Sequence, residues 1–363
     1  MNIVLPKYLH ELKPYTAGKT PNEVQKQYGI ARFIKLASNE NPLGPSPKAM
    51  MAIKNTLKNI HCYPDSKVTD LRHKIATIYQ IMPEQIVIGN GSDEIMGLVG
   101  QALLLPGEEV IIPYPSFSIY EKVATLAQAT LVKVPLRNLA IDLKAIKKKI
   151  TKKTKLIFLT NPHNPTGSFL EANAIHKFLE SIPSSILVVL DEAYVDFVSP
   201  KKRFESVNYL KRFPNLILLR TFSKAYGLAG LRVGYGLMSV ELAGFLEAVR
   251  YPFNVNSLAQ VAALAALEDK EFLERTYKTV WEGRNFLFES LTDMGVKVYP
   301  SEANFLLIYV GKKANEIYKA LLKRGIIIRP LDSYDMPEYF RISIGKPEEN
   351  QLFIEIFKEL WQR

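Results

Sequence analysis

The chain has 363 residues, of which 47% are hydrophobic and 23% are charged, and its formal net charge at pH 7 is +11. No apolar run is long enough to span a bilayer, and Met1–His10 lacks the extended apolar core of a signal peptide. The single cysteine, Cys62, excludes an intramolecular disulfide and favours a reducing cytoplasm. This length favours two domains, or one large domain with a satellite.

Much of the basic excess lies in one short segment ahead of an apolar run. The segment contains Lys144, Lys147, Lys148, Lys149, Lys152, Lys153 and Lys155. No aromatic residues are interleaved with these lysines, and neither a recognition helix nor a zinc-finger spacing is present. We therefore expect a solvated helix face and its exit turn, with no nucleic-acid, membrane or metal partner. The basic balance would still help to attract anionic substrates.

In chain order, the first predicted elements are a short strand over Phe33–Leu36, a polar turn, and a helix that begins near Ser46. From Gln85 onward, short apolar runs alternate with helical patterns, which is typical of a mostly parallel sheet covered on both faces. These runs are Ile86–Ile88, Val110–Ile112, Leu131–Val134, Leu156–Leu159, Ile186–Leu190 and Leu216–Leu219. Leu258–Leu267 and Lys270–Leu291 are predicted helices.

From about Val296 the pattern changes and indicates a small α+β domain. Its predicted strands are Val296–Tyr299, Phe305–Val310, Ile326–Arg329 and Phe340–Ile344, and its predicted helices are Ala314–Lys323 and Pro347–Gln362. The sequence therefore predicts an α/β protein with a three-layer large domain and a smaller α+β domain.

The most unusual stretch is Thr221–Gly236, where a lysine lies between hydroxyl-bearing residues and near an arginine. Lys224 follows Ser223, and Arg232 would lie about two helical turns further on if Ala225–Leu231 is helical. Such a lysine is a candidate for a lowered pKa and for Schiff-base chemistry, and the arginine and hydroxyls would hold a phosphate. The alternative is a polar loop with a solvated lysine.

Ligands of open α/β sheets gather at the carboxyl ends of the strands, and four further strand exits carry unusual residues. The amides of Gly91, Ser92 and Asp93 would lie at a helix N-terminus and bind an anion, although an ordinary capped turn is the alternative. Phe117 follows the next strand and would stack on a flat heterocycle or fill the core. Asn164 lies in a rigid turn with two Asn-Pro steps and would donate to an oxygen or cap a helix.

A carboxylate follows the apolar run Ile186–Leu190: Asp191 would be partly desolvated and would pair with a cation. An apolar strand that ends in Asp-Glu also resembles the magnesium-holding strand of P-loop ATPases, and Gly18-Lys19-Thr20 resembles the end of their phosphate loop. The loop requires a glycine at position 13, where this chain has Lys13, so the ATPase interpretation is the weaker one.

Together these exits supply the groups that pyridoxal phosphate requires. Lys224 would be the Schiff-base nucleophile, Asp191 the partner of the pyridinium nitrogen, and Asn164 and Tyr194 the donors to the ring oxygen. Phe117 would stack on the ring. The phosphate would be held by Gly91, Ser92, Asp93, Thr221, Ser223 and Arg232.

Four segments resemble, in order and approximate spacing, the class I/II aminotransferase family of fold-type I pyridoxal-phosphate enzymes: Ser38–Gly44, Asn161–Gly167, Asp191–Tyr194 and Thr221–Arg232. Within this family, the chain most resembles histidinol-phosphate aminotransferases. This resemblance lies in the arm segments Leu12–Tyr15 and Gly18-Lys19, the segment Tyr63–Asp65, and the arginine strands Ile328–Pro330 and Phe340–Ser343. The family usually has tyrosine at the position of Phe117, so any hydroxyl contact there is lost.

The resemblance implies a homodimer in which Tyr63 of a second subunit touches the cofactor phosphate. It implies that Arg329 and Arg341, helped by Tyr15, bind the anionic end of the substrate in a pocket that Asn41 lines. For the arginines, surface salt bridges are the alternative. The implied division is an arm with part of the small domain (residues 1–45), a large cofactor domain (46–285) and a C-terminal small domain (286–363).

The implied reaction converts L-histidinol phosphate and 2-oxoglutarate to imidazole-acetol phosphate and glutamate in the cytoplasm. The same motifs serve aromatic amino-acid aminotransferases and a phosphothreonine decarboxylase, which remain alternatives. A regulatory cofactor-binding module without catalysis is less expected, because the chain carries no DNA-binding segment.

Overall fold

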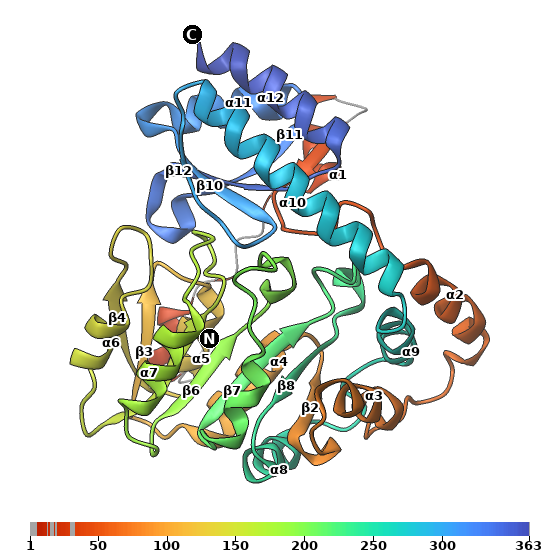
Figure 1. Cartoon of the computed structure of the whole chain (residues 1–363), viewed down its shortest axis with the longest axis vertical. Helices are drawn as coiled ribbons and strands as arrows, with labels where there is room; N and C mark the ends of the chain where they lie inside the picture. The colour runs from red at the N-terminus through yellow and green to blue at the C-terminus, as the bar shows by residue number, and fades with distance from the viewer. Residues whose placement is uncertain (1–5, 13, 15–17, 19, 30–32, 363) are drawn as a thin grey trace, which may run out of the picture.

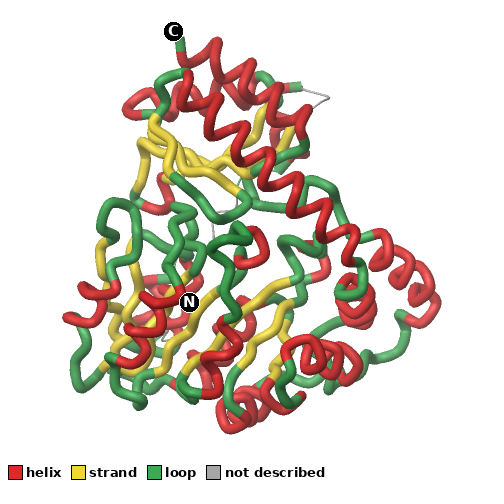
Figure 2. Tube along the Cα trace, viewed as in Figure 1, coloured by secondary structure: helices red, strands yellow, loops and turns green. Residues whose placement is uncertain are grey.

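The computed structural model describes residues 6–12, 14, 18, 20–29 and 33–362, which form two β-sheets surrounded by helices (Figure 1, Figure 2). The strands of the larger sheet are β2 (Ile86–Gly89), β3 (Glu109–Tyr114), β4 (Thr130–Pro135), β5 (Thr154–Thr160), β6 (Leu187–Asp191), β7 (Leu216–Thr221) and β8 (Gly234–Leu237). Their order is β2-β8-β7-β6-β5-β3-β4. Neighbouring strands are parallel from β7 to β4, whereas β8 is antiparallel to both of its neighbours. The predicted mostly parallel sheet is confirmed.

Helices cover both faces of this sheet, which explains the near-continuous apolar runs of its strands. The helices of this part are α2 (Pro47–Thr56), α3 (Thr69–Tyr79), α4 (Ser92–Leu103), α5 (Ser118–Leu126), α6 (Leu143–Lys148), α7 (Ala172–Glu180), α8 (Val240–Val249) and α9 (Ser257–Ala266). In β5, Ile157 and Leu159 pack into the buried cluster that contains α7 side chains. Leu156 and Phe158 pack into the opposite cluster with side chains of α4, α5 and α8.

The smaller sheet joins a strand of the N-terminal region to strands of the C-terminal region (Figure 1). Its strands are β1 (Ile34–Leu36), β9 (Lys297–Tyr299), β10 (Phe305–Tyr309), β11 (Ile326–Leu331) and β12 (Met336–Ser343), in the order β1-β11-β12-β10-β9. Here β1 is parallel to β11 and the other pairings are antiparallel. The accompanying helices are α1 (Pro21–Tyr28), α10 (Lys270–Asp293), α11 (Ala314–Lys323) and α12 (Pro347–Trp361).

The segment that contains Lys224 does not form a helix over Ala225–Leu231. After β7 the chain turns tightly, forms a short 3-10 helix at Ala229–Leu231, and returns antiparallel to β7 as β8, a strand that the sequence analysis missed. Arg232 has a φ of 56°, which reverses the chain ahead of β8. A Cβ atom on Gly234 would lie 2.6 Å from the Ser92 nitrogen, so this position of β8 requires a glycine. Because glycine is uncommon inside strands, it weakens the sequence pattern that would have predicted β8.

The lysine-rich segment is a helix face and its exit turn, as predicted. Lys144, Lys147 and Lys148 are exposed on α6, and three further exposed lysines (149, 152 and 153) follow before β5. Lys155 lies within β5 and is half-buried. In the described part of the chain, no helix combines the length and the apolar character needed to cross a membrane.

Candidate active site

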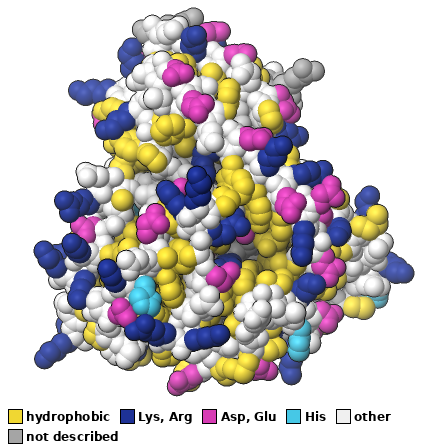
Figure 3. Space-filling model, viewed as in Figure 1, with side chains coloured by type: hydrophobic (Ala, Val, Ile, Leu, Met, Phe, Trp, Pro, Cys, Tyr) yellow, Lys and Arg dark blue, Asp and Glu magenta, His cyan; other side chains and the backbone are white. Residues whose placement is uncertain are grey.

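One pocket collects residues from the carboxyl ends of the large sheet and from the facing strands of the small sheet. It is lined by Gly18, Ala37, Ser38, Asn39, Ser92, Asp93, Phe117, Thr160, Asn164, Asp191, Ala193, Tyr194, Thr221, Ser223, Lys224, Arg232, Arg329, Tyr334 and Arg341. The space-filling view shows a hollow between the two parts, with Lys and Arg side chains inside it (Figure 3). Residues far apart in the sequence therefore meet in one cavity.

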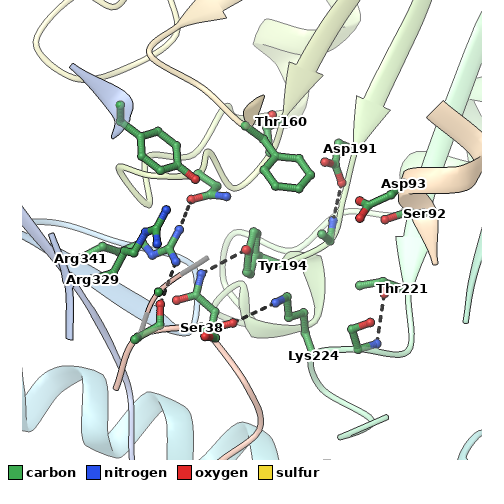
Figure 4. Close-up of a pocket in the computed structure, with 18 of the residues that line it drawn as sticks. Ser38, Ser92, Asp93, Thr160, Asp191, Tyr194, Thr221, Lys224, Arg329 and Arg341 are labelled. Atoms are coloured by element: carbon green, nitrogen blue, oxygen red, sulfur yellow. Dashed lines mark hydrogen bonds between the residues drawn. The ribbon is translucent and has the colours of Figure 1, made fainter. Parts of the chain in front are cut away.

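Lys224 enters the pocket from the turn that follows β7 (Figure 4). Its Nζ donates a hydrogen bond of 3.2 Å to the backbone oxygen of Ser38. Burial and the nearby charge of Arg341 together lower the pKa of Lys224 to about 8. At pH 7 roughly a tenth of this amine is therefore unprotonated, which is the form that attacks a carbonyl.

Asp191 ends β6 as a buried carboxylate whose hydrogen bonds fix its position. Oδ2 accepts a hydrogen bond of 2.6 Å from the Tyr120 hydroxyl, and Oδ1 accepts one of 3.0 Å from the backbone N–H of Ala193. Burial raises the pKa of Asp191 to about 6, although both hydrogen bonds oppose this rise. A buried carboxylate with a raised pKa is stabilised by a cationic ligand atom, as a protonated ring nitrogen would be.

Tyr120 is a component of the site that the sequence analysis did not single out. It is fully buried on α5, its hydroxyl also lies 2.7 Å from the Thr160 hydroxyl, and its ring stacks on Phe158. Its ring also contacts that of Phe117 edge-on, with centroids 5.8 Å apart. Tyr120 therefore supports the carboxylate and the expected stacking ring together.

A cationic cradle forms where α4 begins. Arg232 donates to Asp93 Oδ2 at 3.3 Å and to Ser223 Oγ at 3.5 Å, while Thr221 Oγ1 accepts from the Ser223 N–H at 3.1 Å. Gly91 is the N-cap residue with a φ of 78°, and a Cβ atom there would lie 2.6 Å from Arg232 Nη2. A helix N-terminus beside a guanidinium and two hydroxyls is suited to a phosphate.

Two asparagines orient the remaining polar groups between the cradle and the small sheet. Asn39 Nδ2 donates to the Tyr194 hydroxyl at 3.1 Å, and Arg341 Nη1 donates to Asn164 Oδ1 at 2.6 Å. The second bond directs the amide NH₂ of Asn164 away from Arg341. Burial raises the pKa of Tyr194 to about 12, so its hydroxyl keeps its proton at neutral pH.

The two predicted arginines lie directly opposite each other, because Arg329 on β11 pairs with Arg341 on β12. Both side chains are buried and line the pocket (Figure 4). Arg341 also donates to the backbone oxygen of Ala37 at 3.0 Å, but within the described chain it forms no ion pair. A buried guanidinium without a counter-ion is an expected binding point for an anion.

Most of the predicted site residues lie in this pocket, with a few exceptions. Asn41 lies outside the lining, because its amide donates to the Ala225 oxygen at 2.8 Å and to Thr276 Oγ1 at 3.1 Å; Asn39, two residues earlier, lines the pocket instead. Tyr63 is 82% exposed and stacks on Phe253, away from the pocket of its own chain. Tyr15 lies outside the described residues.

Some lining residues had a sequence signal that was not used. Ser38 and Asn39 belong to the polar turn Ser38–Gly44, and Thr160 directly follows the apolar run of its strand. Tyr334 had no such signal, because only the fold brings it beside the arginines. No cluster of three or more potential metal ligands is found among the described residues.

Comparison with known proteins decides the family. Residues 31–357 match the model of Aminotransferase class I and II. The chain belongs to this family. It is 44% identical to Histidinol-phosphate aminotransferase 2 of Carboxydothermus hydrogenoformans, over 97% of this chain and 98% of that protein. It is also 44% identical to the Histidinol-phosphate aminotransferase of Methylobacillus flagellatus, over 98% and 96% of the two chains.

A solved structure shows the same fold. The histidinol-phosphate aminotransferase from Sinorhizobium meliloti in complex with pyridoxal-5′-phosphate superposes with a TM-score of 0.91 at 28% identity, covering 99% of this chain and 97% of that one. The present chain is therefore a transaminase that depends on pyridoxal phosphate.

The pocket residues fit this cofactor. The buried Asp191 carboxylate suits a ring nitrogen, the Lys224 amine suits an aldehyde, and the cradle at Arg232 suits a phosphate. When bound, pyridoxal phosphate supplies an aldehyde that bonds to amines and a ring that withdraws electrons from the adjoining carbon.

Proposed function

We propose that this transaminase converts L-histidinol phosphate and 2-oxoglutarate to imidazole-acetol phosphate and glutamate, a step of histidine biosynthesis. The observation that carries the proposal is the pair of buried arginines, Arg329 and Arg341, which face the pocket of Lys224 from adjacent strands. Guanidinium groups bind phosphate and carboxylate bidentately, so this pair suits both substrates. The full-length similarity to relatives named histidinol-phosphate aminotransferase supports the same donor.

We assign the cofactor contacts as follows. Asp191 holds the ring nitrogen and keeps it protonated, Asn164 and Tyr194 donate to the ring oxygen, and Phe117 stacks on the ring. The phosphate contacts come from Gly91, Ser92, Asp93, Thr221, Ser223 and Arg232. The support for these assignments is that all of these residues except Gly91 line one pocket, and Gly91 adjoins it as the N-cap of α4.

Lys224 has two roles in this proposal. Its amine would hold the cofactor through the aldehyde, and when the amine is free, Nζ would take the proton from the substrate Cα and carry it as an ammonium group. Burial and Arg341 lower its pKa to about 8, which matches a general base that must also release its proton near neutral pH. Nζ lies over the ring of Tyr194, 5.6 Å from the ring centroid.

The molecule acts, in this proposal, as a cytoplasmic homodimer in which Tyr63 reaches the partner's cofactor phosphate. Its support is the exposed aromatic pair Tyr63 and Phe253, whose ring centroids are 4.7 Å apart, since exposed apolar side chains of this size favour an interface. The cytoplasmic location is inferred from the single cysteine, which the structure places on the surface. We also propose the domain division at residues 45/46 and 285/286. The entry of β1 into the small sheet supports the assignment of the N-terminal part, and the second boundary falls within the continuous helix α10.

The main alternative is an aromatic amino-acid aminotransferase, whose donor carries a carboxylate in place of the phosphate. A phosphothreonine decarboxylase is a weaker alternative. Both use the same cofactor site, so the arginine pair alone does not exclude them.

A substrate panel separates these alternatives. Histidinol phosphate, phenylalanine, tyrosine and phosphothreonine are each offered with 2-oxoglutarate, and glutamate and carbon dioxide are both measured. We expect glutamate with histidinol phosphate at the highest kcat/KM. Glutamate with the aromatic amino acids alone would favour the first alternative, and carbon dioxide from phosphothreonine would favour the second.

A further inference from the structure

The turn that joins the two arginine strands bends back over the pocket. It consists of the 3-10 helix Asp332–Tyr334 and Asp335, between β11 and β12. Ser333 Oγ accepts a hydrogen bond of 3.2 Å from Arg329 Nη2. Two residues later, the Asp335 carboxylate accepts a hydrogen bond from the hydroxyl of Tyr114, which ends β3 in the large sheet. The turn is thus attached both to a substrate arginine and to the opposite side of the cleft.

Tyr334 is the residue of this turn that lines the pocket. Its side chain is 7% exposed and packs with Leu331 and Met336. Among the described residues, its hydroxyl takes part in no hydrogen bond. A nearly buried phenol with an open donor, in a pocket that two arginines also line, is placed to contact a ligand.

A second donor beside it is also open. The Nε of Arg341 is buried and has no hydrogen-bond partner among the described residues, although both Nη atoms of Arg341 are engaged. An anion that bonds to this N–H would lie between the two guanidinium groups. Because both of its Nη atoms are engaged, Arg341 offers a single N–H to an anion, and Arg329 supplies the second guanidinium. Contacts from these two groups suit the two oxygens of a carboxylate but leave one terminal oxygen of a phosphate monoester without a donor.

We propose that Tyr334 is a specificity-determining residue whose hydroxyl donates to the third terminal oxygen of a phosphate held by Arg329 and Arg341, which favours phosphorylated donors over those ending in a carboxylate. The inference rests on the proposed function, because histidinol phosphate is the substrate that carries such a group. The contacts of Ser333 and Asp335 hold the turn, and with it the hydroxyl, at the required place. The carboxylates of 2-oxoglutarate do not need this donor.

The test compares Tyr334→Phe with the wild-type holoenzyme. We expect Ki for inorganic phosphate, and KM for histidinol phosphate, to rise about 10- to 100-fold, which is the effect of one hydrogen bond to a charged group. Ki for glutarate and kcat should stay within about twofold of wild type, because the glutarate carboxylates and the reacting atoms do not use the hydroxyl. Phenylalanine keeps the packing of the tyrosine ring, so the variant should fold normally.

Two further variants complete the design. Tyr309→Phe removes a hydroxyl from β10 of the same sheet, outside the pocket lining, and should change none of these constants. Tyr114→Phe releases Asp335 and should raise Ki for phosphate in the same direction but by less than Tyr334→Phe, because it loosens the turn without removing the donor.

Three results would overturn the inference. Unchanged constants in Tyr334→Phe would show that the residue only packs, and equal losses for phosphate and glutarate would show no preference for phosphate. A loss with histidinol phosphate but not with inorganic phosphate would place the hydroxyl at the imidazole ring. Failure of the proposed function is distinct, since the phosphate and glutarate measurements do not require turnover of histidinol phosphate.

Discussion

The two ends of the pocket differ in how far the chain itself satisfies their polar groups. At the cofactor end, Asp191 accepts from Tyr120 and Lys224 donates to Ser38 before any ligand is present. At the substrate end, Arg341 Nε and the Tyr334 hydroxyl have no partner among the described residues. The difference fits the roles proposed above, in which the large sheet holds fixed catalytic groups and the small sheet presents open donors to an anion. Changes at the first end should therefore lower kcat, and changes at the second should mainly raise KM.

The largest effect is expected from Lys224→Ala. Without the amine, neither the covalent attachment of the cofactor nor the proton transfer at Cα can take place on the chain, so kcat should fall roughly 10⁵-fold or more. Turnover of the preferred donor measures this loss. Borohydride reduction of the wild-type holoenzyme, followed by peptide mapping, should place the label at position 224, and the exposed Lys211→Ala should leave both results unchanged. Near-normal turnover in Lys224→Ala would show that Lys224 is not the catalytic amine, and the proposed difference between the two ends of the pocket would then fail.

The next effect in size is expected from Asp191→Asn. A neutral amide cannot keep the ring nitrogen protonated, so kcat should fall roughly 10²- to 10⁴-fold, while the remaining contacts still bind some cofactor. Steady-state kinetics and a cofactor titration separate the two quantities. A variant with wild-type kcat would show that this carboxylate does not act on the ring.

The same substitution should stabilise the protein without cofactor. Burial raises the pKa of Asp191 to about 6 from an ordinary value of 3.8, so the neutral acid favours the folded state fully below about pH 3.8, and this advantage is lost as pH rises through about 6. At pH 8 the buried charge therefore opposes folding by on the order of 3 kcal/mol. Urea denaturation of the apoprotein should show Asp191→Asn more stable than wild type at pH 8, with little difference near pH 4. An equal difference at both pH values would refute this cause.

Sequence reasoning predicted the groups proposed for the cofactor end, which the structure brings into one pocket, because they follow strands with a simple pattern. Asp191, Asn164 and Lys224 each lie just after an apolar run, and parallel strands bring their carboxyl ends to one edge. Tyr120 was missed because it lies inside a helix, where a buried tyrosine looks like ordinary core. The contact with Asp191 exists only because α5 packs on the sheet beside β6.

The substrate end was less accessible to sequence reasoning. Arg329 and Arg341 were found by family resemblance, but Tyr334 depends on the bend of the turn between them, for which no local pattern exists. Asn41 was predicted from the family resemblance, and only the packing of the polar turn decides that the amide of Asn39, rather than that of Asn41, lines the pocket. The strand β8 was missed because its glycines serve close packing rather than strand formation.

At the substrate end, Arg341→Met should lower kcat/KM roughly 10²- to 10³-fold, chiefly through KM, because a buried charge that binds an anion is lost. A second measurement tests whether Arg341, at the substrate end, affects the pKa of Lys224, at the cofactor end. Burial and the charge of Arg341 together lower the pKa of Lys224 to about 8, so removing this charge should raise the pKa. The rate at which apoprotein binds added cofactor should then increase with pH at a higher midpoint than in wild type.

A matched control is Arg324→Met, which removes an arginine paired with Glu359 on the surface of the small domain. It should leave both KM and the pH midpoint unchanged. If Arg341→Met changes kcat alone, the division of roles between the two sheets is wrong.

The smallest effect is expected at Phe117, which lies at the cofactor end but contributes an apolar contact. Phe117→Leu removes the aromatic stacking and should weaken cofactor binding about 2- to 10-fold, in line with the modest worth of an aromatic pair beyond its buried area. Phe117→Tyr keeps the ring and should change kcat less than about threefold. A fluorescence titration of apoprotein with cofactor measures the first effect, and Phe117→Leu with wild-type affinity would contradict the stacking role. Phe117 contacts Tyr120, which in turn donates to Asp191, so the two substituted positions lie close together. If Phe117→Leu has a small effect and Asp191→Asn a large one, the charge of the side chain, and not its position at the cofactor end, determines the size of the effect.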